Sequence, residues 1–382
     1  MSDDETEQII GNEEEDGIEI DRDKDEGAED IQGDEEDHVE EEKIQPNPLS
    51  QELIADSLSL LCKTGDGLSH AYAQLDIHER ELTNIDILKS FIHLRYVDIS
   101  KNMLKDISAL NYLTQLLTLK AEENLLTSAK LDEMPYLQVA NFSHNKITTT
   151  EGINHPMLEH INLNHNNIQE VTGLEAGKLS RLHTLELRNN KLKSLEGINL
   201  PNLKNLFVAS NLLKKIEGMS RLPGLNTIHL RENQIESLEG FSELQMNLQY
   251  INLRGNAIPN VREVTKLKVL PMLRAVVLSE NPCAEEDDYR LETLIAIRTL
   301  ERLDKDEYSP EERSEAEEIA EKRRAEEEEK AILEAQIMEE IELTEKTLRE
   351  DFENAEDNFY AEGEETEHFE STLGENPAAP EF

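Results

Sequence analysis

One pattern of apolar and polar positions returns nine times along this chain. In one copy the apolar positions are Leu182, Leu185, Leu187 and Leu192, and Asn190 stands between the last two. The pattern reads L-x-x-L-x-L-x-x-N-x-L/I, and neighbouring copies are offset by 21 to 25 residues. A period of this length indicates stacked short units rather than one globular core. The repeated asparagines are Asn102, Asn124, Asn145, Asn166, Asn190, Asn211, Asn233, Asn256 and Asn281.

The spacing inside each copy predicts a short strand with one buried face. Leu206 and Val208 are separated by one residue, the period at which strand side chains return to the same face, and Leu203 packs at the corner before them. Such a strand buries its apolar side chains only when the next copy stacks on it. An Asn side chain both donates and accepts, so at a buried bend it can serve backbone groups that have left the sheet. The pattern therefore predicts a parallel sheet with structural asparagines.

A glycine marks the second half of several copies, at positions 152, 173, 197, 218 and 240, each followed by an apolar residue. This arrangement predicts a turn on the outer arc and a return to the core. The units are too short to hold a full helix there. The pattern resembles the short-repeat class of intracellular leucine-rich repeat proteins, typified by the nuclear regulator of protein phosphatase 1. The resemblance implies an α/β fold, a leucine-rich repeat solenoid with a parallel sheet on its concave face.

Both ends of the repeat array carry cap signals. Leu53, Ile54, Leu58 and Leu61 fit one face of a helix over residues 50–61, which we expect to cover the open N-terminal end. A degenerate first repeat follows, with Arg80 where the pattern asks for Asn. At the other end, residues 300–304 resemble the C-terminal cap motif found after repeats of this class.

The net charge of −46 is concentrated at the two ends. Residues 1–50 hold 22 acidic and 3 basic residues, 305–382 hold 29 and 8, and 51–304 hold 33 and 27. Acidic arms argue against nucleic acid and against an anionic membrane surface as partners, and their composition predicts disorder. We therefore predict a disordered acidic arm (1–49), a cap helix with the degenerate repeat (50–90), repeats with a C-terminal cap (91–308), a charged single helix (309–352) and a disordered acidic tail (353–382).

The charged helix has a start signal and an apolar stripe. Ser309 is placed as N-cap, Pro310 as first helical residue and Glu312 as the partner of a capping box. Without a sustained heptad, we expect a single helix with an apolar distal half rather than a long coiled coil. The stripe either meets a partner or folds back on the solenoid, and the sequence leaves both open. The candidate partner-binding residues are Ile337, Ile341, Leu348 and Phe352.

Outward positions of the predicted strands carry aromatic and arginine side chains. Arg188, Arg231 and Arg254 share one column, interrupted by Ala209. Aromatic residues and Arg are enriched at protein–protein hot spots, and solenoids commonly bind through the concave face. The alternative is an ordinary mixed-charge strand surface. The candidate partner-binding residues on this face are Tyr96, Arg188, Phe207, His229, Arg231, Tyr250 and Arg254.

No set of residues indicates catalysis, a cofactor or a small-molecule substrate. Cys62 and Cys283 lack metal-ligand spacing, and the neighbouring pair His144 and His165 lacks a third ligand, so we interpret these histidines as solvated surface residues. The first residues are not typical of a secretory signal, and no run of about 18 apolar residues occurs. We therefore expect a non-enzymatic protein of the cytoplasm.

Several stretches outside the leucine pattern resemble a family of leucine-rich repeat proteins from the radial spokes of motile cilia and sperm flagella. They are residues 58–65, 67–72, 93–100, 110–114, 197–201, 248–256 and 300–305. The resemblance implies a structural adaptor in the head of radial spoke 3, required for sperm motility. It also implies the cytoskeleton of the axoneme as location, and radial spoke head proteins and other axonemal proteins as partners.

Two other binding functions remain open. A phosphatase-regulating repeat protein would need a strongly acidic, aromatic concave face, whereas this one carries three arginines. An acidic nuclear histone-binding protein would carry tails of nearly pure Asp and Glu, whereas Lys322, Arg323 and Arg324 interrupt this one.

Overall fold

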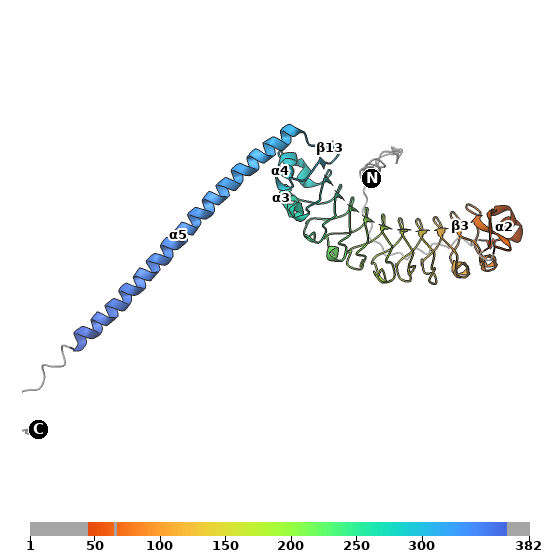
Figure 1. Ribbon diagram of the computed structural model, residues 1–382, viewed down its shortest axis with the longest axis horizontal. Coiled ribbons are helices and arrows are strands. Elements are labelled where there is room, and N and C mark those ends of the chain that lie inside the picture. Colours follow the sequence, from red (N-terminus) through yellow and green to blue (C-terminus); the bar gives the residue numbers. More distant parts are fainter. Residues whose placement is uncertain (1–44, 65–66, 365–382) are drawn as a thin grey trace, which may run out of the picture. The chain divides into compact units, whose positions relative to one another are not determined.

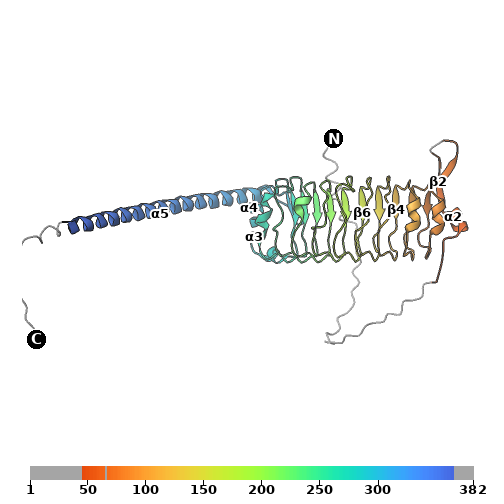
Figure 2. The same cartoon turned by 90° about the horizontal axis from the view of Figure 1, so that it is seen from below.

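The computed structural model describes residues 45–64 and 67–364, with residues 350–364 as backbone only. In these residues 13 strands form one sheet, whose spatial order follows the chain (Figure 1, Figure 2). The strands line the inner side of the repeat stack in Figure 1, which confirms the leucine-rich repeat solenoid. They are β1 (Leu58–Lys63), β2 (His70–Asp76), β3 (Tyr96–Asp98), β4 (Thr118–Lys120), β5 (Val139–Asn141), β6 (His160–Asn162), β7 (Thr184–Glu186), β8 (Asn205–Phe207), β9 (Thr227–His229), β10 (Tyr250–Asn252), β11 (Ala275–Val277), β12 (Arg302–Leu303) and β13 (Asp306–Glu307).

Parallel pairing joins the strands from β2 to β12, one strand from each repeat. Equivalent residues face each other, as Leu185, Leu206 and Ile228 do across β7, β8 and β9. At each end an antiparallel hairpin closes the sheet, β1 with β2 and β12 with β13. This register places matching side chains of neighbouring repeats about 4.8 Å apart.

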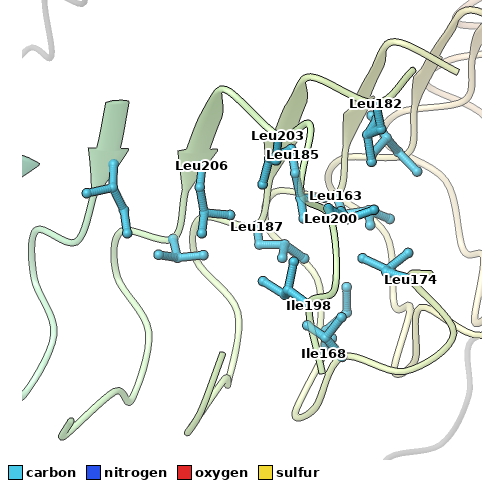
Figure 3. Close-up of a cluster of buried hydrophobic side chains, with 14 of the residues drawn as sticks. Leu163, Ile168, Leu174, Leu182, Leu185, Leu187, Ile198, Leu200, Leu203 and Leu206 are labelled. Carbon is cyan, nitrogen blue, oxygen red and sulfur yellow. The ribbon is translucent and has the colours of Figure 1, made fainter. Parts of the chain in front are cut away.

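Short helical segments occupy many of the connections on the outer side, and the longest run there covers residues 261–269. Behind the strands, the leucines of successive repeats lie against one another (Figure 3). Leu163, Leu185 and Leu206 are fully buried in this continuous core. The helical turns are η1 (Asp86–Ser90), η2 (Ser108–Tyr112), η3 (Met219–Arg221), α3 (Val261–Val264), η4 (Thr265–Val269) and η5 (Pro282–Glu285).

The asparagine column occupies the bends after the strands, as predicted. Asn190 donates from Nδ2 to the carbonyl oxygens of Leu163 (2.9 Å) and Leu187 (3.1 Å), and its Oδ1 accepts from the N–H of Ile168 (3.0 Å). The residue before it, Asn189, has a left-handed φ of 53°. A positive φ also precedes every other asparagine of the column, which shows that the bend is a repeated backbone structure.

The N-terminal cap differs from the prediction in two ways. Helix α2 (Gln51–Ser57) begins at its N-cap Ser50 but ends four residues before Leu61, because residues 58–63 pair with β2 as strand β1. Leu61 is consequently 59% exposed instead of packing on a helix face. The folded part also starts before residue 50: the N–H of buried Leu49 donates to the carbonyl of Asn84. Most of the predicted acidic arm, residues 1–44, lies outside the described residues.

The predicted C-terminal cap is present. Asp304 accepts the N–H groups of Leu278 and Ser279 at 2.8 Å each, and the hydroxyl of Tyr289 donates to its other oxygen at 3.0 Å. Tyr289 begins helix α4 (Tyr289–Ala296), which packs its Leu294 into the end of the core. Asp304 therefore accepts at this end the N–H of Leu278 that the carbonyl of a following strand accepts within the repeats, as that of Val277 does for Leu253.

Helix α5 (Pro310–Glu364) begins where the sequence predicts but is longer. The capping box is formed: Ser309 N–H donates to Glu312, and Glu312 N–H donates to the Ser309 hydroxyl. The helix continues through residues 353–364, which we predicted to be part of a disordered tail; residues 365–382 lie outside the described residues. This stretch contains no proline, which would stop a helix, and it includes glutamate and alanine, which favour one.

The first turns of α5 are docked on the C-terminal cap rather than fully solvated. Ala316 is buried, and Arg313 donates to the carbonyl oxygen of Leu300 at 2.6 Å. Both terminal nitrogens of Arg323 donate to the carboxylate of Glu292 on α4, at 2.6 and 2.8 Å. These contacts fix the start of the helix to the repeat domain.

Candidate functional site

An aromatic ladder, formed by Phe207, His229 and Tyr250, crosses β8, β9 and β10 on the concave face. Parallel register sets Phe207 beside His229, and their ring centroids are 4.7 Å apart. The rings of His229 and Tyr250 follow with centroids 5.2 Å apart and planes tilted by 44°. Tilted rings at these separations attract each other. Three repeats therefore contribute to one continuous aromatic surface.

Arg188 extends the aromatic ladder on its β7 side. Its guanidinium carbon lies 4.6 Å from the centroid of the Phe207 ring, within cation–π range. The backbone N–H of Arg188 donates to Oδ1 of Asn164 at 2.7 Å, which fixes the chain where the side chain leaves it. Arg188 and Phe207 were both predicted on this face, and the structure brings them into contact.

His229 is a neutral member of the aromatic ladder. Burial is the main cause that lowers its pKa to about 3, and the positive charges of Arg188 and Arg231 lower it further. An imidazole with this pKa carries no charge at physiological pH. The ladder therefore presents a neutral aromatic surface close to the permanently charged guanidinium groups of Arg188 and Arg231.

Glu186, which the sequence analysis did not single out, lies beside this surface on β7. Its carboxylate contacts Nε2 of His160 (2.9 Å) and accepts from Nδ2 of Asn164 (2.7 Å). Burial raises the pKa of Glu186, but these hydrogen bonds outweigh it and hold the pKa below its usual range. The carboxylate of Glu186 is thus ionised and already bound by His160 and Asn164. The signal for it was the diagonal placement of His160 and Glu186 at outward positions of adjacent strands.

The remaining predicted residues of the concave face differ in their surroundings. Arg231 is exposed and forms no ion pair with any other described residue. Arg254 donates from Nη2 to Oε1 of Glu280 at 2.6 Å, so its charge is already paired. Tyr96 is 38% exposed on β3, five strands from β8, or about 24 Å by strand spacing. The structure therefore does not bring Tyr96 to the ladder.

The second predicted surface lies on α5. Ile337 and Ile341 are 48% and 45% exposed, and Leu348 is 67% exposed. Every side chain from residue 321 to 349 is exposed, so this stripe does not fold back on the repeats. Met338, at 58% exposure, adds to the apolar surface, whereas the side chain of Phe352 lies outside what the structure describes.

His144 and His165 are stacked, as their equivalent positions in adjacent repeats suggested. Their ring centroids are 4.0 Å apart and their planes differ by 11°. Nε2 of His165 also lies 3.2 Å from the side-chain amide of Asn189. Across residues 45–64 and 67–364, no group of three or more His, Cys, Asp or Glu side chains is arranged to hold a metal ion. In the same residues no helix has the length and apolar character needed to cross a bilayer.

Comparison with known proteins agrees with this architecture. The family described as Leucine-rich repeat matches residues 197–333, and the family described as Leucine Rich repeats (2 copies) matches residues 156–200. Leucine-rich repeat-containing protein 23 of Homo sapiens is 52% identical over 269 residues, covering 70% of this chain and 78% of the human protein. The chain belongs to the leucine-rich repeat-containing protein 23 family. The Xenopus tropicalis member is 52% identical over 278 residues, covering 70% of this chain and 76% of its own.

The solved structures to which the chain is similar include two other repeat proteins. The leucine-rich repeat domain of APL1B has a TM-score of 0.46 and 22% identity, covering 55% of this chain and 61% of that one. An internalin of Listeria monocytogenes has a TM-score of 0.34 and 17% identity, covering 62% of this chain and 87% of the internalin chain.

Proposed function

We propose that this chain is a non-enzymatic structural adaptor of the ciliary and flagellar axoneme. In this proposal it acts in the head of radial spoke 3 through protein–protein contacts required for sperm motility. Family membership and the repeat solenoid support a role in protein interaction. The axonemal assignment rests on the resemblance of the non-repeat stretches. The observation that carries the interaction role is the aromatic ladder with Arg188 and Arg231 beside it.

The geometry of this surface suits a rigid recognition site. Strand pairing holds Phe207, His229 and Tyr250 in place before any partner arrives, so little conformational entropy is lost on binding. An acidic side chain of a partner can pair with Arg231, and an apolar or aromatic one can pack on the rings. The proposed partner segment is therefore acidic and carries an aromatic residue.

The competing functions predict other surfaces. A histone-binding protein needs carboxylates where it grips basic tails, and the centre of this face carries guanidinium groups instead. Phosphatase regulation, as a second candidate, would recruit a catalytic subunit. The experiment below distinguishes histone binding and phosphatase regulation from the spoke function, because the proteins recovered on the purified chain identify the function.

The experiment is an affinity recovery from axonemal, nuclear and cytosolic extracts of ciliated cells. The double variant Arg188→Glu/Arg231→Glu and the single variant Phe207→Ala should each reduce recovery of spoke-head proteins at least about tenfold, as expected for a hot spot. Arg262→Glu, an exposed charge reversal on α3, is the control and should recover them normally. Recovery of histones or a phosphatase subunit in place of spoke proteins would replace the proposal, and equal recovery by all variants would remove the ladder from it.

A further inference from the structure

The hairpin of β1 and β2 extends beyond the rest of the sheet. β2 has seven residues, but β3 pairs only with Gln74, Leu75 and Asp76. The preceding residues of β2 pair with β1 alone, through contacts such as Ala71 with Cys62. In Figure 2 this hairpin, coloured orange, reaches past the ends of the neighbouring strands. Its outer half is therefore a two-stranded ribbon that overhangs the turns leading into β3 and β4.

A hollow of about 300 Å³ lies under this overhang. The ribbon supplies one wall, where Ala71 and Ala73 leave space because their side chains are small. The turn before β3 supplies the opposite wall, including Ile92, which is 50% exposed. The residues lining the hollow are Cys62, Lys63, Thr64, Ala71, Ala73, Ile92, His93, Arg95, Thr114 and Gln115.

The charge of this hollow is opposite to that of the chain. Its lining includes Lys63, His93 and Arg95 and no carboxylate from the described residues. Neither Lys63 nor Arg95 forms an ion pair within residues 45–64 and 67–364. The protein as a whole has a net charge of −46, whereas the described lining of this hollow carries basic side chains without an acidic partner among the described residues.

A second hollow gives a comparison from the same molecule. It measures about 330 Å³ and lies between the outer turns of two neighbouring repeats. Lys105 and Lys130 line it together with Asp106 and Asp132, so its charges balance. Size and position on a repeat edge therefore do not by themselves produce a cationic lining.

We infer that the hollow under the hairpin is a docking site for an acidic peptide segment of a partner protein. Carboxylates of the segment pair with Lys63 and Arg95, and an apolar side chain between them packs on Ile92 and Ala71. Thr114 and Gln115 supply polar groups at the rim. A peptide fits better than a small anion because half of the wall is apolar and would gain nothing from phosphate. This site is separate from the aromatic ladder and does not depend on an axonemal location.

The test measures binding of a fluorescent peptide, in which Glu alternates with Leu, to the full-length protein by anisotropy at low ionic strength. Non-specific attraction is excluded by the net negative charge of both molecules. Lys63→Glu/Arg95→Glu should weaken binding at least tenfold, and the neutral pair Lys63→Met/Arg95→Met should weaken it as well. Lys105→Glu/Lys130→Glu changes the net charge equally and should leave the affinity within twofold.

Three outcomes would overturn the inference. The first is that the peptide fails to bind the wild-type protein. The second is that Lys63→Glu/Arg95→Glu and Lys105→Glu/Lys130→Glu weaken peptide binding equally. The third is that inorganic phosphate displaces the peptide more effectively than chloride of the same ionic strength, which would make the hollow a small-anion site. Melting curves of each variant establish that it is folded. Because purified protein is used, failure here leaves the spoke-protein recovery on the aromatic ladder unaffected.

Discussion

Asn211 and Leu192 belong to neighbouring repeats and are joined by a hydrogen bond: Oδ1 of Asn211 accepts the N–H of Leu192 at 3.0 Å. From the same side chain, Nδ2 donates to the carbonyl oxygens of Leu187 at 2.9 Å and Val208 at 3.1 Å. One buried amide thus satisfies backbone groups of its own repeat and of the one before. The asparagine column is therefore an interface between repeats as well as a bend within each.

Replacing this amide should weaken the stack. Asn211→Ala leaves a buried N–H and the carbonyl groups of Leu187, Val208 and Ala209 without that partner, and we expect a loss of about 1–3 kcal/mol in the free energy of unfolding. Urea titration measures it. Asn202→Ala is the control, since its exposed side chain makes one hydrogen bond, to the carbonyl of Ser180. Equal midpoints for the two variants would contradict the structural role of Asn211.

Gly240 should not tolerate a side chain. Its φ is 112°, and a Cβ atom there would lie 1.8 Å from the carbonyl oxygen of Ile216 in the preceding repeat. Gly240→Ala should therefore lower the free energy of unfolding by at least about 2 kcal/mol, since backbone has to shift. At Gly177 a Cβ would meet nothing within 4 Å, so Gly177→Ala should be nearly neutral. Thermal melts of the two variants side by side test this difference.

Acid should destabilise the repeats through His155. This buried imidazole accepts the N–H of Met134 at Nδ1 (3.2 Å), and burial lowers its pKa to about 4. The unfolded chain, with a histidine pKa near 6.5, binds the proton first, so stability is complete above about pH 6.5 and falls as the pH drops towards 4. The loss amounts to about 3 kcal/mol.

The variant His155→Gln isolates this effect, because it removes the titrating group and keeps an acceptor. Stability measured by urea between pH 7 and pH 4 should fall less steeply in His155→Gln than in the wild type. Carboxylates titrate in both proteins and cancel in the difference. Parallel curves would show that His155 is not the group responsible.

Two truncations should separate the docked and exposed parts of α5. A chain ending at Tyr308 loses buried Ala316 and the ion pair of Glu312 with Arg290, so its melting temperature should fall. A chain ending at Arg324 keeps these contacts and should melt like the wild type. In cells, the Arg324 truncation should nevertheless assemble poorly into axonemes, because it lacks the apolar stripe. Normal assembly of that chain would exclude the stripe as an attachment site.

The repeat core was predictable because its signal is short-range and periodic. Leu185, Asn190 and Leu206 fall at fixed offsets. When similar units stack, each strand buries one face in the core and exposes the other to solvent. The hairpin was not predictable on the same grounds. Leu58 and Leu61 fit a helix face as well as a strand, and only pairing with β2, a contact 10 to 20 residues away in the chain, decides between them.

The repeat pattern predicted which residues share the concave face, but it did not predict which of their side chains are in contact. Phe207 and His229 were predicted only as outward residues of the same face, and the structure adds that their rings are adjacent and tilted against each other. The pairing of Arg254 with Glu280 and of Glu186 with His160 depends on side-chain rotamers, which a repeat pattern does not specify. Tyr96 and Tyr250 occupy equivalent positions in their strands, yet the strands between β3 and β10 keep the two side chains apart.

The docked start of α5 also sets the direction in which its distal residues point. Arg323, held by Glu292, fixes the rotation of the helix about its own axis, and Ile337 follows 14 residues later, or about 21 Å along the axis. Each residue inserted between them turns the apolar stripe by about 100°. Removing seven residues would shorten this distance by about 10 Å yet change the direction by only about 20°. The number of residues between Arg323 and Ile337 thus sets the direction in which the apolar stripe faces as well as its distance from the repeats. A partner that binds the stripe depends on both.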